Sequence, residues 1–203
     1  MSSLKEINMT YRVVWFAALL GALIALTVSA QPRIPGWMLA GSDPQSYSIG
    51  ISEKAGRLGG PAGYLQGRGD TDGFGTMMQT FLASQYEGNR VRISAQIKTE
   101  NLKQAAGLWM RVDGKRGKVL SFDNMMDRPI KGSTDWKRYE IVLDAPSGTE
   151  RIAFGVLMVD RGHLWVEDVK FEVVSATVPV TTKTVPPEDP DARAPQNLDF
   201  KMR

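Results

Sequence analysis

Apolar and polar residues alternate in short segments from residue 36 to residue 174. In residues 90–98, Val, Ile, Ala and Ile occupy every second position, with Arg, Ser, Gln and Lys between and around them. An alternation of period two predicts a β-strand with one buried face. Similar segments, separated by turn residues, predict strands at 36–40, 47–51, 62–66, 74–81, 104–113, from 118 onward, 136–144, 151–159 and 163–174. Because helical periodicity is hardly seen after residue 30, we expect an all-β, two-sheet antiparallel sandwich.

Both ends of the chain differ from this pattern. Lys5 and Arg12 precede an apolar run over residues 13–28, and the small residues of Val28-Ser29-Ala30 follow the run. This order predicts a signal peptide over residues 1–30, and the alternative is an uncleaved membrane anchor. From residue 175 the chain is rich in proline and mixed charge, which predicts a disordered tail over 175–203. The sandwich is therefore expected over residues 31–174.

Composition narrows the compartment and the partners. The chain of 203 residues has no cysteine and a formal charge of +3. An exported chain without disulfides fits a periplasmic or extracellular protein, or one anchored to the inner membrane if the apolar segment is retained. The absence of cysteine excludes thiolate catalysis and Cys-bound metals. The small charge and the lack of a basic run argue against nucleic acid as a partner.

The segment 104–113 has an unusual second face. Leu108, Met110 and Val112 alternate with Trp109, Arg111 and Asp113. Side chains on one face of a strand are about 7 Å apart, so an indole, a guanidinium and a carboxylate form one row. An aromatic ring beside a donor and an acceptor suits a flat polar ligand such as a sugar. The alternative is that Trp109 covers a second apolar layer and that Arg111 and Asp113 form an ion pair.

Further polar side chains complete the candidate site. The residues expected to contact the ligand are Gln79, Gln96, Trp109, Arg111, Asp113, Asp123, Asn124 and Arg128. The first hypothesis is a non-catalytic binding module for a carbohydrate or a similar polar ligand. The competing hypothesis is an envelope structural scaffold without a small ligand, whose proline-rich tail meets a protein partner. An open groove with Trp109 beside Arg111 favours the first, and a buried Trp109 favours the second.

The last predicted strands also resemble a known family. Their patterns are Trp136-x-x-Tyr-x-Ile-x-Leu143, Ile152-x-Phe-Gly155 and Gly162-x-x-Trp-Val-Glu-Asp-Val-x-Phe171. Over residues 36–174 the sequence resembles galactose-binding-like jelly-roll domains, the fold of many carbohydrate-binding modules. The resemblance implies two antiparallel sheets, one of them often ligand-bearing, and a structural role for the acidic pair at 167 and 168.

The resemblance also raises the possibility of a structural calcium ion, which many such modules hold. Residues 70–73, Asp-Thr-Asp-Gly, resemble part of a calcium loop. The full loop spacing is missing, and a plain turn is the preferred interpretation of the segment. We therefore expect no cofactor, with calcium kept as an open alternative.

Enzymatic function is not indicated. The single histidine, His163, follows a glycine in a predicted turn, which is a poor setting for a catalytic triad. Several carboxylates are available for glycosidase chemistry, but no sequence feature marks a pair of them as catalytic. We expect no catalytic residues.

Overall fold

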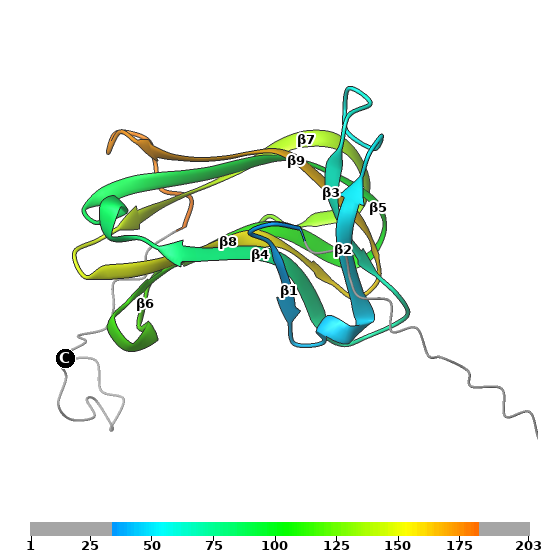
Figure 1. Cartoon of the computed structure of the whole chain (residues 1–203), viewed down its shortest axis with the longest axis horizontal. Helices are drawn as coiled ribbons and strands as arrows, with labels where there is room; N and C mark the ends of the chain where they lie inside the picture. The colour runs from blue at the N-terminus through cyan, green and yellow to red at the C-terminus, as the bar shows by residue number, and fades with distance from the viewer. Residues whose placement is uncertain (1–33, 183–203) are drawn as a thin grey trace, which may run out of the picture. The chain divides into compact units, whose positions relative to one another are not determined.

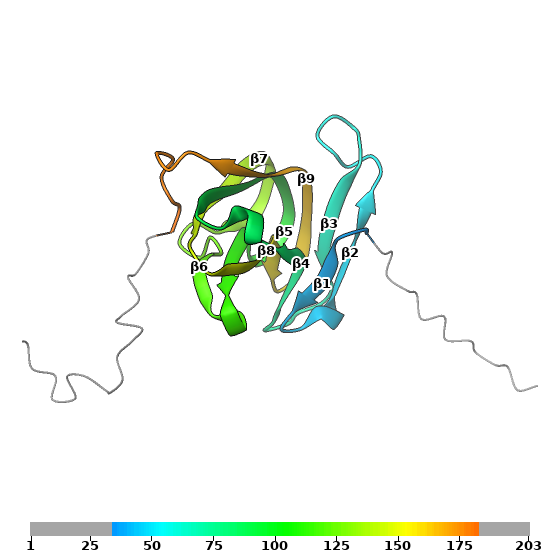
Figure 2. The same ribbon diagram turned by 60° about the vertical axis from the view of Figure 1, so that its left-hand side comes forward.

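The computed structural model describes residues 34–182 as an antiparallel β-sandwich without an α-helix. The strands form one continuous hydrogen-bonded sheet that folds into two layers (Figures 1 and 2). Their bounds are β1 Met38–Gly41, β2 Tyr47–Ser52, β3 Ala62–Gly67, β4 Phe74–Leu82, β5 Asn89–Gly114, β6 Val119–Asp123, β7 Ile130–Ala145, β8 Thr149–Val159 and β9 Gly162–Val174. Three short 3-10 turns, η1 Pro44–Ser46, η2 Ser84–Tyr86 and η3 Lys115–Gly117, lie between strands. The predicted all-β class is confirmed.

Strand β5 joins the two layers. Its first half pairs with β7 and β9, and β9 continues through β3 to β2. Its second half pairs with β8 and β6, and β8 continues through β4 to β1. The pairing slips between these halves, where Asn101 adopts a φ of 53°. Asparagine tolerates this left-handed conformation better than most residues, so it suits the bend. We call the sheet of β2, β3, β9, β7 and the first half of β5 the first layer, and the remaining strands the second layer.

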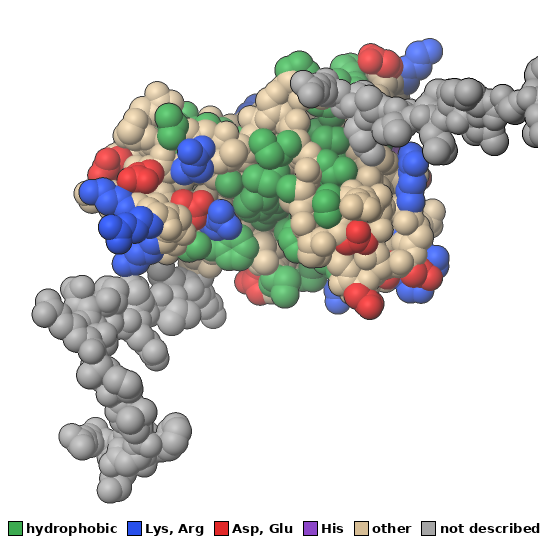
Figure 3. Space-filling model, turned by 60° about the horizontal axis from the view of Figure 1, so that its bottom comes forward, with side chains coloured by type: hydrophobic (Ala, Val, Ile, Leu, Met, Phe, Trp, Pro, Cys, Tyr) green, Lys and Arg blue, Asp and Glu red, His purple; other side chains and the backbone are tan. Residues whose placement is uncertain are grey.

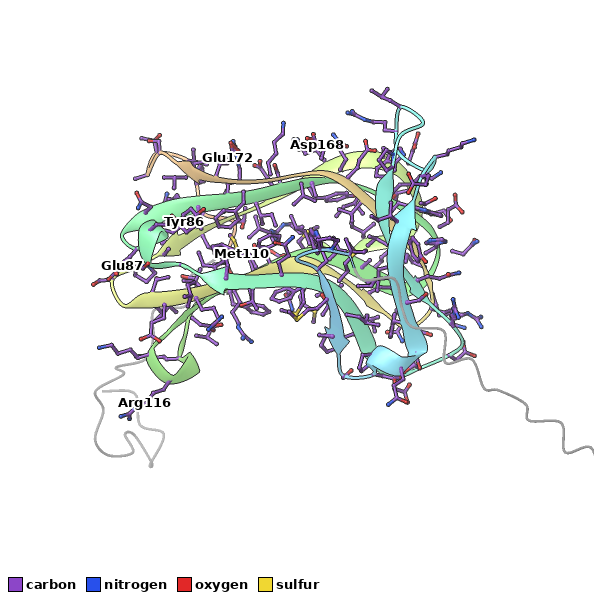
Figure 4. The ribbon with its side chains drawn as sticks, viewed as in Figure 1. Tyr86, Glu87, Met110, Arg116, Asp168 and Glu172 are labelled. Carbon is purple, nitrogen blue, oxygen red and sulfur yellow. The ribbon has the colours of Figure 1, made fainter. Side chains whose placement is uncertain are left out.

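The alternating residues of β5 form the centre of the core. Val91, Ile93 and Ile97 in its first half are 0% exposed, and so are Met110 and Val112 in its second half. Figure 4 shows Met110 between the two layers. The period-two pattern therefore predicted the buried face of this strand correctly, and burial of these side chains is the main contribution to the stability of the sandwich.

Aromatic side chains connect the layers at one end of the sandwich. Phe154 on β8 and Phe171 on β9 stack with ring centroids 5.7 Å apart. Phe81 on β4 meets both rings edge to face, at 6.1 and 5.3 Å. Offset and edge-to-face contacts of this kind add to the energy of apolar burial.

Two segments differ from the sequence predictions. Residues 130–135 precede the strand predicted at 136–144, but they form the beginning of β7. Residues 175–182 were assigned to the disordered tail, yet the Nη1 group of Arg90 donates to the carbonyl oxygens of Ala176 and Val178 at 2.7 and 2.6 Å. The backbone N–H of Thr181 also donates to the carbonyl oxygen of Val142 at 2.9 Å. The first part of the tail is therefore attached to the edge of β7.

Other expectations fall on parts of the chain that the structure does not describe. The predicted signal peptide or anchor, residues 1–30, and the tail beyond residue 182 lie outside the described residues. Within residues 34–182, no helix is long and apolar enough to cross a membrane.

Candidate functional site

The outer face of the second layer carries an open groove of about 540 Å³. Strands β1, β4, β8 and β5 form its floor, and Phe122 of β6 with the loop that follows forms one wall. Its apolar side chains include Phe74, Met78, Phe122, Met126, Leu157 and Val159. Figure 3 views this side of the molecule and shows hydrophobic side chains gathered in its middle. Clustered apolar groups on a surface of this kind mark an interaction site more often than scattered ones.

Trp109 forms part of the floor of the groove. It pairs with Gly155 on β8, and its Nε1 donates to the hydroxyl of Thr76 on β4 at 2.7 Å. The indole therefore reaches across β8 at a position where the strand has no side chain. The residue is 9% exposed, so the ring is held firmly and only a small part of it meets solvent. The structure thus combines the two alternatives, because Trp109 is nearly buried and still lines an open groove beside Arg111.

Arg111 and Asp113 form the same-face ion pair that the alternation allowed. The Nε atom of Arg111 lies 3.0 Å from Oδ1 and 3.1 Å from Oδ2 of Asp113. The arginine side chain is 47% exposed and the aspartate side chain 7% exposed. The carboxylate therefore lies behind the guanidinium and orients it, while the guanidinium faces the groove.

Asp123 and Arg128 hold the loop that borders the groove. Arg128 donates to Asp123 Oδ2 at 2.7 Å, and the backbone N–H of Met125 donates to Oδ1 at 2.9 Å. The hydroxyl of Thr181 donates to the same Oδ2 at 2.6 Å. Burial raises the pKa of Asp123, but these hydrogen bonds outweigh burial and lower that pKa below its usual value. Asp123 and Arg128 therefore support the loop and do not line the groove.

Asn124 is the residue of this loop that reaches the ligand side. It lines the groove together with Met126, which is 78% exposed. Its Oδ1 accepts from the backbone N–H of Met126 at 3.2 Å, which fixes the orientation of the amide.

The two predicted glutamines lie elsewhere. Gln79 pairs with Phe154 and shares the inward-facing side of β4 with Met77, next to the entry segment at Gly36. Gln96 lies in the first half of β5, paired with residues of β7 and β9, and so belongs to the first layer. The groove therefore brings together Trp109, Arg111 and Asn124 from the predicted set, with Asp113 behind the arginine.

Sequence reasoning missed the apolar walls. Phe74 and Met78 fall on one face of the strand predicted at 74–81, but nothing in the sequence indicated that this face was the outer one. The sequence did offer one signal, because residues 74–78 carry apolar side chains on both faces of the predicted strand. Phe74 and Met78 lie on one face, and Met77 lies on the other, where the structure buries it in the core. A strand with two apolar faces is expected to cover a core on one side and a ligand or partner on the other.

The described residues contain no candidate metal cluster. Residues 34–182 contain no group of three or more His, Asp or Glu side chains that could hold a metal ion. Asp70 of the calcium-like segment pairs with Arg161 at 2.9 Å. His163 lies on β9 in the first layer, where it stacks on Trp165 with centroids 3.7 Å apart. Burial lowers the pKa of His163, because it disfavours the charged form of the imidazole.

Comparisons with known proteins found a curated relative of the chain. No known family model matches the chain. An uncharacterised HTH-type transcriptional regulator, YbfP of Bacillus subtilis (strain 168), is 42% identical over 173 residues. The match covers 84% of this chain and 58% of the relative, so the chain spans less than two thirds of that protein.

Several solved structures share the β-sandwich fold of this chain. A xylan-binding domain of carbohydrate-binding family 22 has a TM-score of 0.50 at 11% identity, covering 70% of this chain and 89% of that domain. The CBM22-1–GH10 modules of the Clostridium thermocellum xylanase 10B have a TM-score of 0.51 at 13% identity, covering 69% of this chain and 26% of that one. The enzymatically active domain of a Bacteriophage CBA120 tailspike protein has a TM-score of 0.51 at 13% identity, covering 70% and 20% of the two chains. The described part of the chain has the jelly-roll β-sandwich fold of carbohydrate-binding modules.

Proposed function

We propose that this domain is a non-catalytic binding module that takes a carbohydrate in the groove on the outer face of the second layer. The observation that carries the proposal is the convergence of Trp109, Arg111 and Asn124 on one open groove with apolar walls. A sugar ring has an apolar C–H face and a polar rim, so an indole floor with polar groups beside it suits such a ring.

The chemistry of the lining supports binding and gives no support to catalysis. Among the described residues, no carboxylate lines the groove. Glycoside hydrolysis by the usual route needs two carboxyl groups on either side of the scissile bond. The two acidic residues that the sequence analysis assigned to the site, Asp113 and Asp123, each form an ion pair with an arginine.

A second candidate function is ligand sensing in a gene regulator, and the 42% identity to a protein named as a transcriptional regulator favours it. The described residues contain no α-helix, so a helix-turn-helix cannot lie within residues 34–182. In this alternative the groove would bind an effector, and the domain would act inside the cell. The carbohydrate-binding candidate agrees with the exported location predicted from residues 1–30, which stays a prediction.

Isothermal titration of the full-length chain against neutral and acidic glycans tests the proposal. A saturable interaction is expected, and Met126→Ala should weaken it, because this exposed side chain lies at the rim of the groove. Leu58→Ala is the matched control, since Leu58 is 93% exposed and does not line the groove. If no glycan binds, or if both variants weaken binding equally, the proposal is wrong.

A further inference from the structure

We infer that the ligand of this groove carries a carboxylate, which Arg111 and Asn124 bind, joined to a flat body with an apolar face. The inference rests on the proposed function only in taking the groove as the ligand site. It adds the charge and the shape of the ligand, which the fold does not supply.

The first observation is the state of the Arg111 guanidinium. Asp113 engages its Nε atom, while Nη1 and Nη2 have no hydrogen-bond partner among the described residues. A guanidinium fixed in this way presents two parallel N–H donors, and this fork matches the two oxygens of a carboxylate. The fork is half-exposed and lines the groove.

The second observation is that the other polar side chains of the groove, Thr76 and Asn124, offer more free hydrogen-bond donors than accessible free acceptors. Asn124 already accepts through Oδ1 from the backbone of Met126, which leaves its Nδ2 group to donate. The hydroxyl of Thr76 accepts from Trp109 and donates to the carbonyl oxygen of Val156 at 2.9 Å, so its one donor is used. Its remaining lone pair is poorly accessible, because Thr76 is only 4% exposed. A neutral sugar presents hydroxyls that must donate as well as accept, and the side chains of this groove offer them little to donate to.

The third observation is the charge of the lining. Among the described residues that line the groove, Arg111 carries the only charge. Asp113 lies behind it with a nearly buried side chain and does not line the groove. An anionic group entering from solvent therefore meets the exposed donors of the arginine without facing a carboxylate.

The apolar walls define the rest of the ligand. The side chains of Phe74, Met78 and Leu157 have no strong hydrogen-bonding group for a ligand hydroxyl. The body of the ligand must therefore present C–H or aromatic surface to them. A volume of about 540 Å³ lies within the usual range for small-ligand sites and is larger than one sugar ring needs. Two sources share this chemistry: a uronic-acid oligosaccharide and a non-sugar aromatic acid.

Calorimetric titration of the full-length chain separates these sources. The ligands are digalacturonate with its methyl ester, the neutral digalactoside, and phenylpropionate with its methyl ester. At least one of the two acids should bind. For an acid that binds, the ester or neutral counterpart should bind about tenfold more weakly or worse, because the charge-assisted hydrogen bonds are lost. Binding of the acid should also weaken as salt is raised from low to physiological concentration.

Two variants test the named residues, and a third is the control. Arg111→Gln should lower the affinity for the acid about tenfold or more. Asn124→Asp keeps the acceptor for the backbone N–H of Met126 and places a negative charge in the groove. It should therefore lower the affinity for the acidic ligand while leaving the fold intact. Arg116→Gln is the charge-matched control, since Arg116 lies on the exposed turn η3, away from the groove lining (Figure 4).

The outcomes distinguish this inference from the proposed function. Equal binding of acid and neutral sugar, unaffected by Arg111→Gln and Asn124→Asp, overturns the inference and leaves carbohydrate binding in place. Binding of phenylpropionate without any sugar supports the inference and refutes the carbohydrate proposal. Binding of none of the ligands overturns both.

Discussion

Replacing Thr181 by valine should destabilise the sandwich, although sequence composition placed this residue in a disordered tail. The Thr181 hydroxyl donates to the buried carboxylate of Asp123 at 2.6 Å and accepts from the backbone N–H of Val142 at 3.0 Å. Valine has nearly the same shape and can do neither. The substitution therefore removes hydrogen bonds without opening a cavity.

The size of the effect follows from the partners that remain. A hydrogen bond to a charged group contributes about 1.5–3 kcal/mol to stability. Asp123 keeps Arg128 and the N–H of Met125, while the N–H of Val142 loses its partner, so we expect a loss of about 2 kcal/mol. For a domain of this size the midpoint of thermal unfolding should fall by roughly 4–8 °C.

The assay is thermal and urea unfolding of the full-length chain followed by circular dichroism. Thr177→Val is the matched control, because the Thr177 hydroxyl contacts only the exposed Ser175 hydroxyl at 2.9 Å, and its effect should stay within about 0.5 kcal/mol. If the two variants unfold at the same midpoint as the wild type, the attachment of residues 175–182 to β7 is refuted.

The pH dependence of the same variant is a second check. Because its hydrogen bonds lower the pKa of Asp123 in the folded protein, the stability they contribute is present above the unfolded pKa of about 4. It is lost as the pH falls further, through the folded pKa. The difference between wild type and Thr181→Val should therefore be full at pH 7 and should shrink at the acid end.

Further predictions concern the floor of the groove. Trp109→Phe loses the donor to Thr76 and should lower the free energy of unfolding by about 1–2 kcal/mol in urea titrations, with the fold retained. Gly155→Ala should cost about 2 kcal/mol or more, or abolish folding, because a Cβ there would clash with the carbonyl oxygen of Met77. Gly60→Ala is its control, since a Cβ at Gly60 meets nothing within 4 Å. Equal stability of the two glycine variants would contradict the close approach of β4 and β8.

The strands could be predicted because their alternation reflects burial of one face. The prediction of separate strands at 90–98 and 104–113 missed that β5 is continuous. Residues 99–103 break the alternation, and a sequence cannot tell a turn from a strand that changes layers. The strand at residues 130–135 was missed for a related reason. Lys131, Gly132 and Ser133 are exposed on both faces of β7, so no alternation of apolar and polar residues marks this segment as a strand.

The sequence predicted the site residues that lie close together on one strand. It did not predict those whose position depends on which strands pair with each other. Trp109 and Arg111 share one face of one strand, so their proximity follows from spacing alone. Gln96 also projects outward from β5, but on the other side of the bend, and its layer depends on pairing with β7 and β9. Arg128 was expected to reach the groove, and the ion pair with Asp123 holds it away.

The most direct test of the groove as the ligand site is a backbone amide and indole N–H chemical-shift titration of the full-length chain with digalacturonate. Shifts that saturate together at Trp109, Arg111 and Asn124, while Trp165 on the first layer stays unchanged, are the predicted result. Saturable shifts confined to Trp165 and its neighbours would place the ligand on the opposite face and contradict the account.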